Sequence, residues 1–327
     1  MKQIVFTFLL LSVIGLVSCR KKGVELNIQQ YDTQQIQQYI AAHGLTGMQK
    51  DTVGGDTSGI YYQPIITGNK AMPLNDTTKV SMVFSLSSFD GKYTNTDTIG
   101  NHFCDYIGHI ATGGLPAGLR IALLNDLRNN GGSMRILIPS RLAYGVYGNG
   151  SGSSQNANTH IAGNQCLDYY VHLITNINGY DSLCMQNYIK SQSLTGYTSQ
   201  KVAVPSTYTF TSPLPHPDSV TYFYKVETPG TGVGYITQNS VVEATYTGIL
   251  LDNTVFDSAN NGADSVSLMV PNLIPGVQDA LTHIQGGGSL ISMILPSALC
   301  YGTNASTGIT VNSCLRFEFE IYSVTGH

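Results

Sequence analysis

The chain of 327 residues is long enough for about two domains, and its 42% hydrophobic residues are enough to fill packed cores. Only 11% of the residues are charged and the formal net charge is -4, which excludes the basic surface that nucleic-acid-binding proteins use. The 35 glycines and 20 tyrosines favour a β structure with many turns over a helical one.

The first residues, MKQIVFTFLLLSVIGLVSC, have the organisation of a secretory signal peptide. Lys2 supplies a positive start, and residues 4–17 form an apolar stretch that is too short to span a membrane. The ending Leu-Val-Ser-Cys19 resembles the lipobox of bacterial lipoproteins, in which the peptide is cut before the cysteine and lipid is attached to its thiol. This pattern predicts a signal peptide over residues 1–18 and lipidation of Cys19. The alternatives are an ordinary signal peptide or a structural cysteine.

The segment QQYDTQQIQQYIAAH, residues 29–43, is predicted to be one amphipathic helix. Ile36, Tyr39 and Ile40 fall on its apolar side. We expect this helix to dock on a domain or to act as a spacer. Dimerisation is the third interpretation.

Three segments of the first half return in the second half in the same order, which indicates two copies of one domain. The pairs are SGIYYQPIITGN (58–69) with SVTYFYKVETPG (219–230), IPSRLAYG (138–145) with LPSALCYG (295–302), and NQCLDYYVHL (164–173) with NSCLRFEFEI (312–321). Two units of this size favour tandem domains over a solenoid, which needs shorter and more numerous repeats.

The repeat predicts the organisation of the whole chain. The expected parts are a signal peptide (1–18), a lipidated linker with the helix (19–57), a degenerate first domain (58–178), a linker rich in Ser, Thr and Pro (179–218) and a second domain (219–327).

Two periodicities predict the fold class of each unit. One face of the closing segment is apolar while the other carries Arg316, Glu318 and Glu320, which is typical of a half-buried antiparallel strand. The apolar residues of that strand are Leu315, Phe317, Phe319 and Ile321. A short helical stripe is formed by Val277, Ala280, Leu281 and Ile284. We therefore expect an α+β fold of two domains, each a curved antiparallel β-sheet wrapped on one short helix, preceded by the N-terminal helix.

The second half resembles the FKBP-type peptidyl-prolyl cis-trans isomerases over residues 219–324. The resemblance rests on the ordered segments YTGILLDNTVFDSA, LIPGVQDAL, GGGSLISMILPSALCYG and SCLRFEFEI. Residues 58–178 resemble the same family more loosely. With its lipobox and tandem units, the chain resembles a lipoprotein isomerase from a Bacteroidetes-like bacterium.

The resemblance implies non-covalent catalysis in an apolar pocket of the second domain, without a cofactor. It assigns catalytic roles to Tyr246, Phe256, Asp257, Ile274, Tyr301 and Phe317, and substrate-binding roles to Leu268, Leu273, Val277 and Ile309. Asp257 matches the pocket carboxylate. The Ile274 N–H and the Tyr301 hydroxyl match the groups that hydrogen-bond the peptide.

The sequence departs from the family pattern in both units. Val277 stands where the family usually has Trp on the pocket floor, and Leu268 stands where Phe is common. The second domain is therefore expected to be an isomerase with weakened or retuned activity, the alternative being an inactive binding module or chaperone of the cell envelope. Phe84, Thr94 and Asn95 replace Tyr, Phe and Asp in the first domain, which favours a scaffold that could still bind unfolded chains.

The resemblance and the N-terminal pattern together imply the partners and the location. The expected partners are proline-containing unfolded or nascent exported polypeptides, a membrane reached through lipid on Cys19, and a macrolide inhibitor in the second domain. Arg20 and Lys21 after the cysteine favour the outer membrane, facing the periplasm. The five other cysteines form no CxxC pair and the chain has no HExxH motif, so no metal site is expected.

Overall fold

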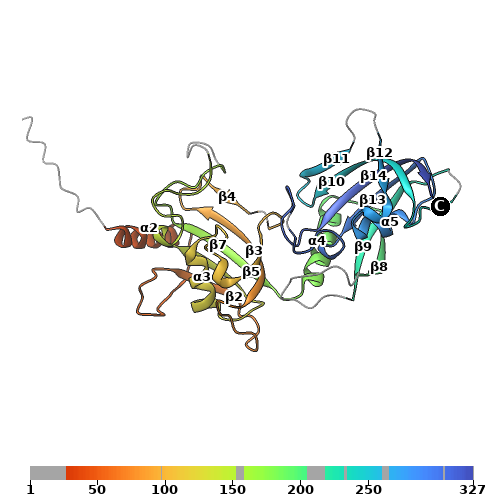
Figure 1. The fold of residues 1–327 in the computed structure, drawn as a ribbon. Coiled ribbons are helices and arrows are strands. Elements are labelled where there is room, and N and C mark those ends of the chain that lie inside the picture. Colours follow the sequence, from red (N-terminus) through yellow and green to blue (C-terminus); the bar gives the residue numbers. More distant parts are fainter. Residues whose placement is uncertain are drawn as a thin grey trace, which may run out of the picture.

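The computed structural model contains two antiparallel sheets, each enclosing a core of its own (Figure 1). It describes residues 27–96, 98–151, 158–204, 218–231, 234–259, 265–304 and 306–326. The predicted signal peptide and Cys19 lie outside these residues. Among the described helices, none has the length and apolarity that crossing a membrane requires.

The first sheet has seven strands in the order β1-β2-β6-β7-β3-β4, with β5 also paired to β3. The strands are β1 Gln49–Lys50, β2 Tyr61–Ile66, β3 Lys79–Ser88, β4 Thr94–Asn95, β5 His102–Tyr106, β6 Ser133–Ile138 and β7 Leu167–Ile174. Helix α3, Ala117–Ala122, continues into a π-helical turn, Leu123–Leu127, and its Leu119 is fully buried in the core of this sheet.

The second sheet repeats this topology strand for strand, in the order β11-β10-β14-β13-β9-β8 with β12 also paired to β10. Its strands are β8 Thr198–Ala203, β9 Ser219–Thr228, β10 Val241–Leu250, β11 Val255–Ala259, β12 Val266–Met269, β13 Ser289–Leu295 and β14 Leu315–Thr325. Helix α5, Pro275–Leu281, buries Val277, Ala280 and Leu281 in the second core. The predicted α+β fold of two sheets, each with a short helix, is confirmed.

The burial of β14 follows the predicted alternation. Leu315, Phe317, Phe319 and Ile321 are buried. Arg316 and Glu318 point away from the core and bond to each other. Strand β14 thus turns an apolar face to the core and a polar face to the other side of the sheet, where Arg316 also bonds the Tyr188 hydroxyl.

Helix α2, Ile28–Ala42, docks on the first domain, which is one of its two favoured interpretations. Asn27 caps the helix by accepting a 2.9 Å hydrogen bond from the Gln30 N–H, and the Gln30 side chain accepts one from the Asn27 N–H in return. Ile36 is fully buried. The buried carboxylate of Asp32 accepts a 2.6 Å hydrogen bond from Ser140 Oγ. The helix is therefore tied to the Pro-Ser turn that the repeat contains.

The second unit begins earlier than expected. Residues 179–218 were predicted to be a linker, yet helix α4, Ile177–Ser191, and strand β8 lie there. Met185 and Tyr188 of α4 are buried, and β8 pairs with β9 (Figure 1). The linker prediction is corrected for this part, because burial against the second sheet compensates for the weak local pattern of these residues. Each unit thus consists of a helix followed by a seven-stranded sheet.

Helix α4 is tied to its sheet by the same contact as α2. Asp181 Oδ2 accepts hydrogen bonds from the Ser297 N–H at 2.9 Å and from Ser297 Oγ at 2.7 Å. In the first unit a guanidinium nitrogen of Arg141 also lies 3.5 Å from Asp32 Oδ2. Asp181 has no such partner at the equivalent place, because the residue after Ser297 is Ala298. Since Asp181 is completely buried, its burial raises its pKa to about 7.

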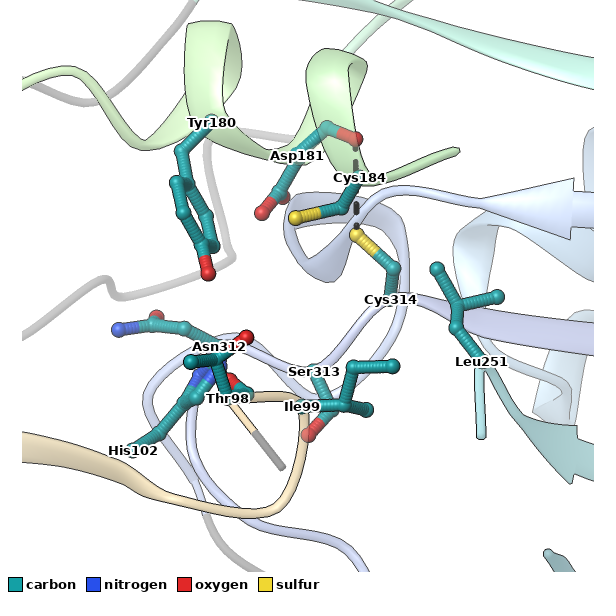
Figure 2. A pocket seen from close by; sticks show the side chains of 10 residues that line it. All are labelled: Thr98, Ile99, His102, Tyr180, Asp181, Cys184, Leu251, Asn312, Ser313 and Cys314. Carbon is teal, nitrogen blue, oxygen red and sulfur yellow. Dashed lines mark hydrogen bonds between the residues drawn. The ribbon is translucent and has the colours of Figure 1, made fainter. Parts of the chain in front are cut away.

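The first domain is seated on the second unit next to α4. Asn312 Nδ2 donates to Ser81 Oγ at 3.1 Å, and a ring nitrogen of His102 lies 2.7 Å from the Val311 carbonyl oxygen. Figure 2 shows side chains of the first domain, of α4 and of the loop before β14 pointing toward one space. This cavity measures about 10 Å³, which is room for one water molecule.

The raised pKa of Asp181 predicts how stability depends on pH. Because the folded chain binds this proton more tightly than the unfolded chain, the contribution of Asp181 to the free energy of unfolding is largest below its ordinary pKa of 3.8 and is lost as the pH rises toward 7. Urea unfolding between pH 4.5 and 8 measures this slope. Asp181→Asn is expected to flatten it.

The matched control is Asp32→Asn, which changes the equivalent carboxylate of the first unit. This change removes the charged partner of Arg141 and is expected to lower the free energy of unfolding. A slope that stays unchanged in Asp181→Asn would show that this carboxyl does not titrate in the range.

Candidate functional site

The concave side of the second sheet contains a cavity of about 250 Å³ beside α5. Its lining is mostly apolar or aromatic and comes from β10, β11, β12, β14, α5 with the segment before it, and the Tyr-Gly corner after β13. The residues are Tyr246, Asp257, Leu268, Asn272, Leu273, Ile274, Val277, Tyr301, Phe317 and Phe319. A hollow of this composition suits a small apolar group that carries one or two polar atoms.

A hydrogen bond between two neighbouring strands places the carboxylate in the wall of the cavity. The β10–β11 pairing sets Gly248 opposite Asp257, and the Tyr246 hydroxyl donates to Asp257 Oδ2 at 2.8 Å. Burial, together with this carboxylate, raises the pKa of Tyr246 to about 12. The hydroxyl therefore keeps its proton at neutral pH and holds the carboxylate in place.

Two hydrogen-bond donors of the lining have no hydrogen-bond partner among the described residues. Ile274 is the N-cap of α5, and its N–H lies at the start of the helix, where intrahelical acceptors are missing. The half-buried Tyr301 hydroxyl is the second donor, and burial raises its pKa. Gln278 Nε2 donates to the Leu273 carbonyl at 2.6 Å and to the Pro271 carbonyl at 3.2 Å, which holds the segment before Ile274. The site thus offers fixed donors to a polar atom within an apolar hollow.

The aromatic wall depends on a glycine. Phe256 meets Phe317 edge to face with ring centroids 5.7 Å apart, and Tyr246 stacks on Phe319 at 5.3 Å. A Cβ atom at Gly248 would lie 2.6 Å from the Phe256 ring, closer than real side chains approach. Only glycine leaves these rings room to meet.

The structure brings together eight of the ten residues predicted for the second-domain site. They are Tyr246, Asp257, Leu268, Leu273, Ile274, Val277, Tyr301 and Phe317. Phe256 stands behind the lining, against Phe317, and Ile309 is buried in the core next to it. Phe319 was expected only on the apolar face of the closing strand. Asn272, Gln278 and Gly248 were not predicted for the site, although the glycine belongs to the segment YTGILLDNTVFDSA.

Strand register places the first-domain counterparts. Leu86 pairs with Asn95 as Gly248 pairs with Asp257, so Asn95 and Thr94 take the predicted places of Asp257 and Phe256. Leu86 stands for Gly248 and is buried. The first domain therefore has a large side chain on β3, where the second domain has glycine. It has no aromatic ring at the place of Phe256.

The turn before α3 also differs chemically from the turn before α5. Gly118 abuts Ile138 and Leu142 as Gly276 abuts Leu295 and Leu299, so these glycines are equivalent. Pro116 then takes the place of Ile274. Proline has no N–H, and the first domain lacks this donor.

Residues 234–322 match the family model described as FKBP-type peptidyl-prolyl cis-trans isomerase, so this stretch is similar to that family. The FKBP-type peptidyl-prolyl cis-trans isomerase FkpA of Buchnera aphidicola subsp. Schizaphis graminum is 34% identical over 101 residues, which are 31% of this chain and 40% of the relative. The outer membrane protein MIP of Legionella longbeachae is 34% identical over 102 residues, 31% of this chain and 43% of that protein. The crystal structure of FkpA from Escherichia coli has a TM-score of 0.35 and 23% identity, covering 45% of this chain and 61% of that one. The chain spans less than half the length of the two curated relatives.

Among the described residues, no group of three or more His, Cys, Asp and Glu side chains could hold a metal ion.

The role of Gly248 is testable. Gly248→Ala places a Cβ against the Phe256 and Phe317 rings and is expected to lower the free energy of unfolding by about 1–3 kcal/mol. Urea denaturation measures this loss. Ala244→Gly, in the same strand, removes a buried methyl group and serves as the comparison for a cavity-forming change. An unchanged free energy of unfolding in Gly248→Ala would contradict the requirement for glycine.

Proposed function

We propose that the second domain catalyses the cis–trans isomerisation of X-Pro peptide bonds in exported polypeptides. The observation that carries this proposal is an apolar cavity of proline size with two fixed donors, the Ile274 N–H and the Tyr301 hydroxyl, beside the Asp257 carboxylate. The names of the relatives that match this domain support the same reaction.

The reaction requires no covalent bond between the substrate and the protein. Rotation about the C–N bond breaks amide conjugation and meets a barrier of ~18–20 kcal/mol. As the bond twists, the carbonyl loses negative character and the nitrogen becomes pyramidal. A cavity that excludes water and holds the twisted peptide lowers the barrier because it binds that geometry better than the planar one. A reduction of ~5–7 kcal/mol corresponds to about 10⁴–10⁵-fold acceleration.

Each lining group has a place in this mechanism. Leu268, Leu273 and Val277 receive the proline ring, while the Ile274 N–H and the Tyr301 hydroxyl hold the carbonyl oxygens of the peptide. Asp257, held by Tyr246, faces the twisted amide with negative charge. A macrolide inhibitor would compete for the same hollow.

Val277 sets the expected strength of this activity. It is 2% exposed and forms an apolar floor without the flat surface of an aromatic ring. We therefore propose weak or retuned turnover. The alternative, a binding module without useful turnover, is favoured by this same residue.

The first domain is proposed to be a scaffold that can bind unfolded chains. Leu86 fills the place of Gly248, and Pro116 removes the donor that Ile274 provides. Neither the carboxylate nor the N–H of the second domain has a counterpart there.

The enzyme proposal is tested on the full chain by a protease-coupled isomerisation assay with a Leu-Pro peptide. Asp257→Ala and Tyr301→Phe are each expected to lower kcat/KM by about tenfold or more, equivalent to ~1.4 kcal/mol of transition-state stabilisation. The matched controls are Asn95→Ala and Tyr144→Phe in the first domain, which should leave the rate unchanged.

Two results would overturn parts of this proposal. A wild-type chain that gives no acceleration over the uncatalysed reaction leaves only the binding module. A rate that survives both second-domain changes would show that the isomerase uses other residues.

We further propose that the chain is a lipoprotein of a Bacteroidetes-like cell envelope, anchored through Cys19 in the outer membrane and facing the periplasm. The lipobox-like ending of the first 19 residues supports the anchor. The Legionella relative, named an outer membrane protein, supports the location.

Lipidation predicts how the chain fractionates. Cys19→Ala is expected to move the protein from the membrane fraction to the soluble fraction, because acyl chains contribute ~0.8 kcal/mol of membrane affinity per buried CH₂. Cys104→Ala is the control and should stay with membranes. The intact mass reports the lipid directly, and a Cys19 thiol without acyl mass would refute the anchor.

A further inference from the structure

The repeat creates the same face twice, once in each unit. The face is built from the start of the unit's helix, the Pro-Ser turn and the loop before the closing strand. Asn164 and Asn312 mark it in the two units. Both have positive φ, 58° and 57°, and their N–H groups donate to Gly145 at 2.7 Å and to Gly302 at 2.6 Å. The two faces are therefore equivalent in backbone geometry.

In the second unit the first domain covers this face. Asn312 is only 2% exposed, because its side chain donates to Ser81 in strand β3. Ile177, at the start of α4, is 4% exposed. Thr310 Oγ1 lies 3.4 Å from the Ile99 carbonyl of the first domain, which extends the contact. The edge formed by β3 and β5 is thus the element that fits this face.

In the first unit the equivalent face forms an open groove of about 780 Å³. Its lining residues are Ile28, Tyr31, Ser140, Arg141, Gly145, Val146, Gly163 and Asn164. Ile28 is 39% exposed where Ile177 is 4%, and Asn164 is exposed where Asn312 is buried. Val146 is 64% exposed. The isoleucine and the asparagine that are covered in one unit are thus in contact with solvent in the other.

The second domain carries an edge of the same construction as the one that covers Asn312. Ser81 of β3 pairs with Cys104 of β5, and Glu243 of β10 pairs with Ser267 of β12. Glu243 is therefore the counterpart of Ser81.

The charges of the two open surfaces match. The open edge has Glu243 where the covering edge has Ser81. The open groove is lined by Arg141, which also bonds Asp32 and the Ser58 carbonyl, where the second unit has Ala298 buried in its core. A carboxylate on the incoming edge would meet a guanidinium in the groove. Opposite charges at corresponding positions favour this pairing over two edges or two grooves.

We propose that the groove of the first unit binds a second copy of this chain, through the β10–β12 edge of that copy's second domain. The contact reproduces between copies the one that joins the two units within a chain. It is head-to-tail, so an open assembly keeps a free groove at one end and a free edge at the other, and association continues with concentration.

Disulfide trapping between two single variants tests this arrangement. When full chains carrying Asn164→Cys are mixed with full chains carrying Glu243→Cys under mild oxidation, a covalent dimer containing one of each is expected. Peptide mass spectrometry of the cross-link identifies the two cysteines. The double variant Ser81→Cys/Asn312→Cys is the matched control, and it should close within one chain because those side chains already touch.

The results of these experiments distinguish a second copy of the chain from other occupants of the groove. A dimer in Asn164→Cys alone, or none in the mixture while the control closes, would overturn the head-to-tail contact. Sedimentation velocity provides the second measurement, in which Val146→Glu should reduce the concentration-dependent rise in the sedimentation coefficient of the wild type. A protein that stays monomeric but binds lipid vesicles through Val146 would show that a membrane surface, and not a second copy, covers the groove.

Discussion

Gly248 carries no side chain, and the rings of Phe256 and Phe317 occupy the space that a Cβ would take. Because this space is limited, the residue at this position decides in both units whether aromatic rings can pack beside it on the concave face of the sheet. Leu86 fills it in the first domain, the ring on β4 is lost to Thr94, and Phe84, Leu86 and their neighbour Tyr169 are buried. In the second domain Phe317 lines a cavity instead, with Phe256 packed behind it.

The polar groups of the two units diverge in the same direction. A carboxylate in a cavity wall is stable only with a donor beside it, and Tyr246 supplies that donor to Asp257. The position of Asp257 holds an amide, Asn95, in the first domain, and that of Ile274 holds a proline, Pro116. Loss of charge and loss of an N–H together leave the first domain as a folded but chemically different copy.

A buried carboxylate ties each helix to its sheet, and here the two units differ in charge balance. Asp32 accepts a hydrogen bond from Ser140 and has Arg141 beside it, whereas Asp181 accepts from the hydroxyl and N–H of Ser297 and has Ala298 at the place of the arginine. This alanine is buried in the second core. The first unit has Arg141 at this place, where it lines the open groove and bonds Asp32 and the Ser58 carbonyl.

The sequence by itself determined the two-unit repeat, the alternating strand β14, helix α2 and most of the lining of the second-domain cavity. These follow from local periodicity and from motifs whose spacing is set by strand and helix geometry. The sequence could not reveal that α4 and β8 belong to the second unit, because their stability comes from burial against β9 and Ser297 and not from their own pattern. Nor did the sequence reveal the roles of Gly248 and Gln278. These roles depend on contacts with Phe256 and Phe317 and with the Leu273 carbonyl, which form only in the folded chain. The tertiary structure decided which face of the repeat is covered and which is open, because that depends on how one folded unit packs against the other.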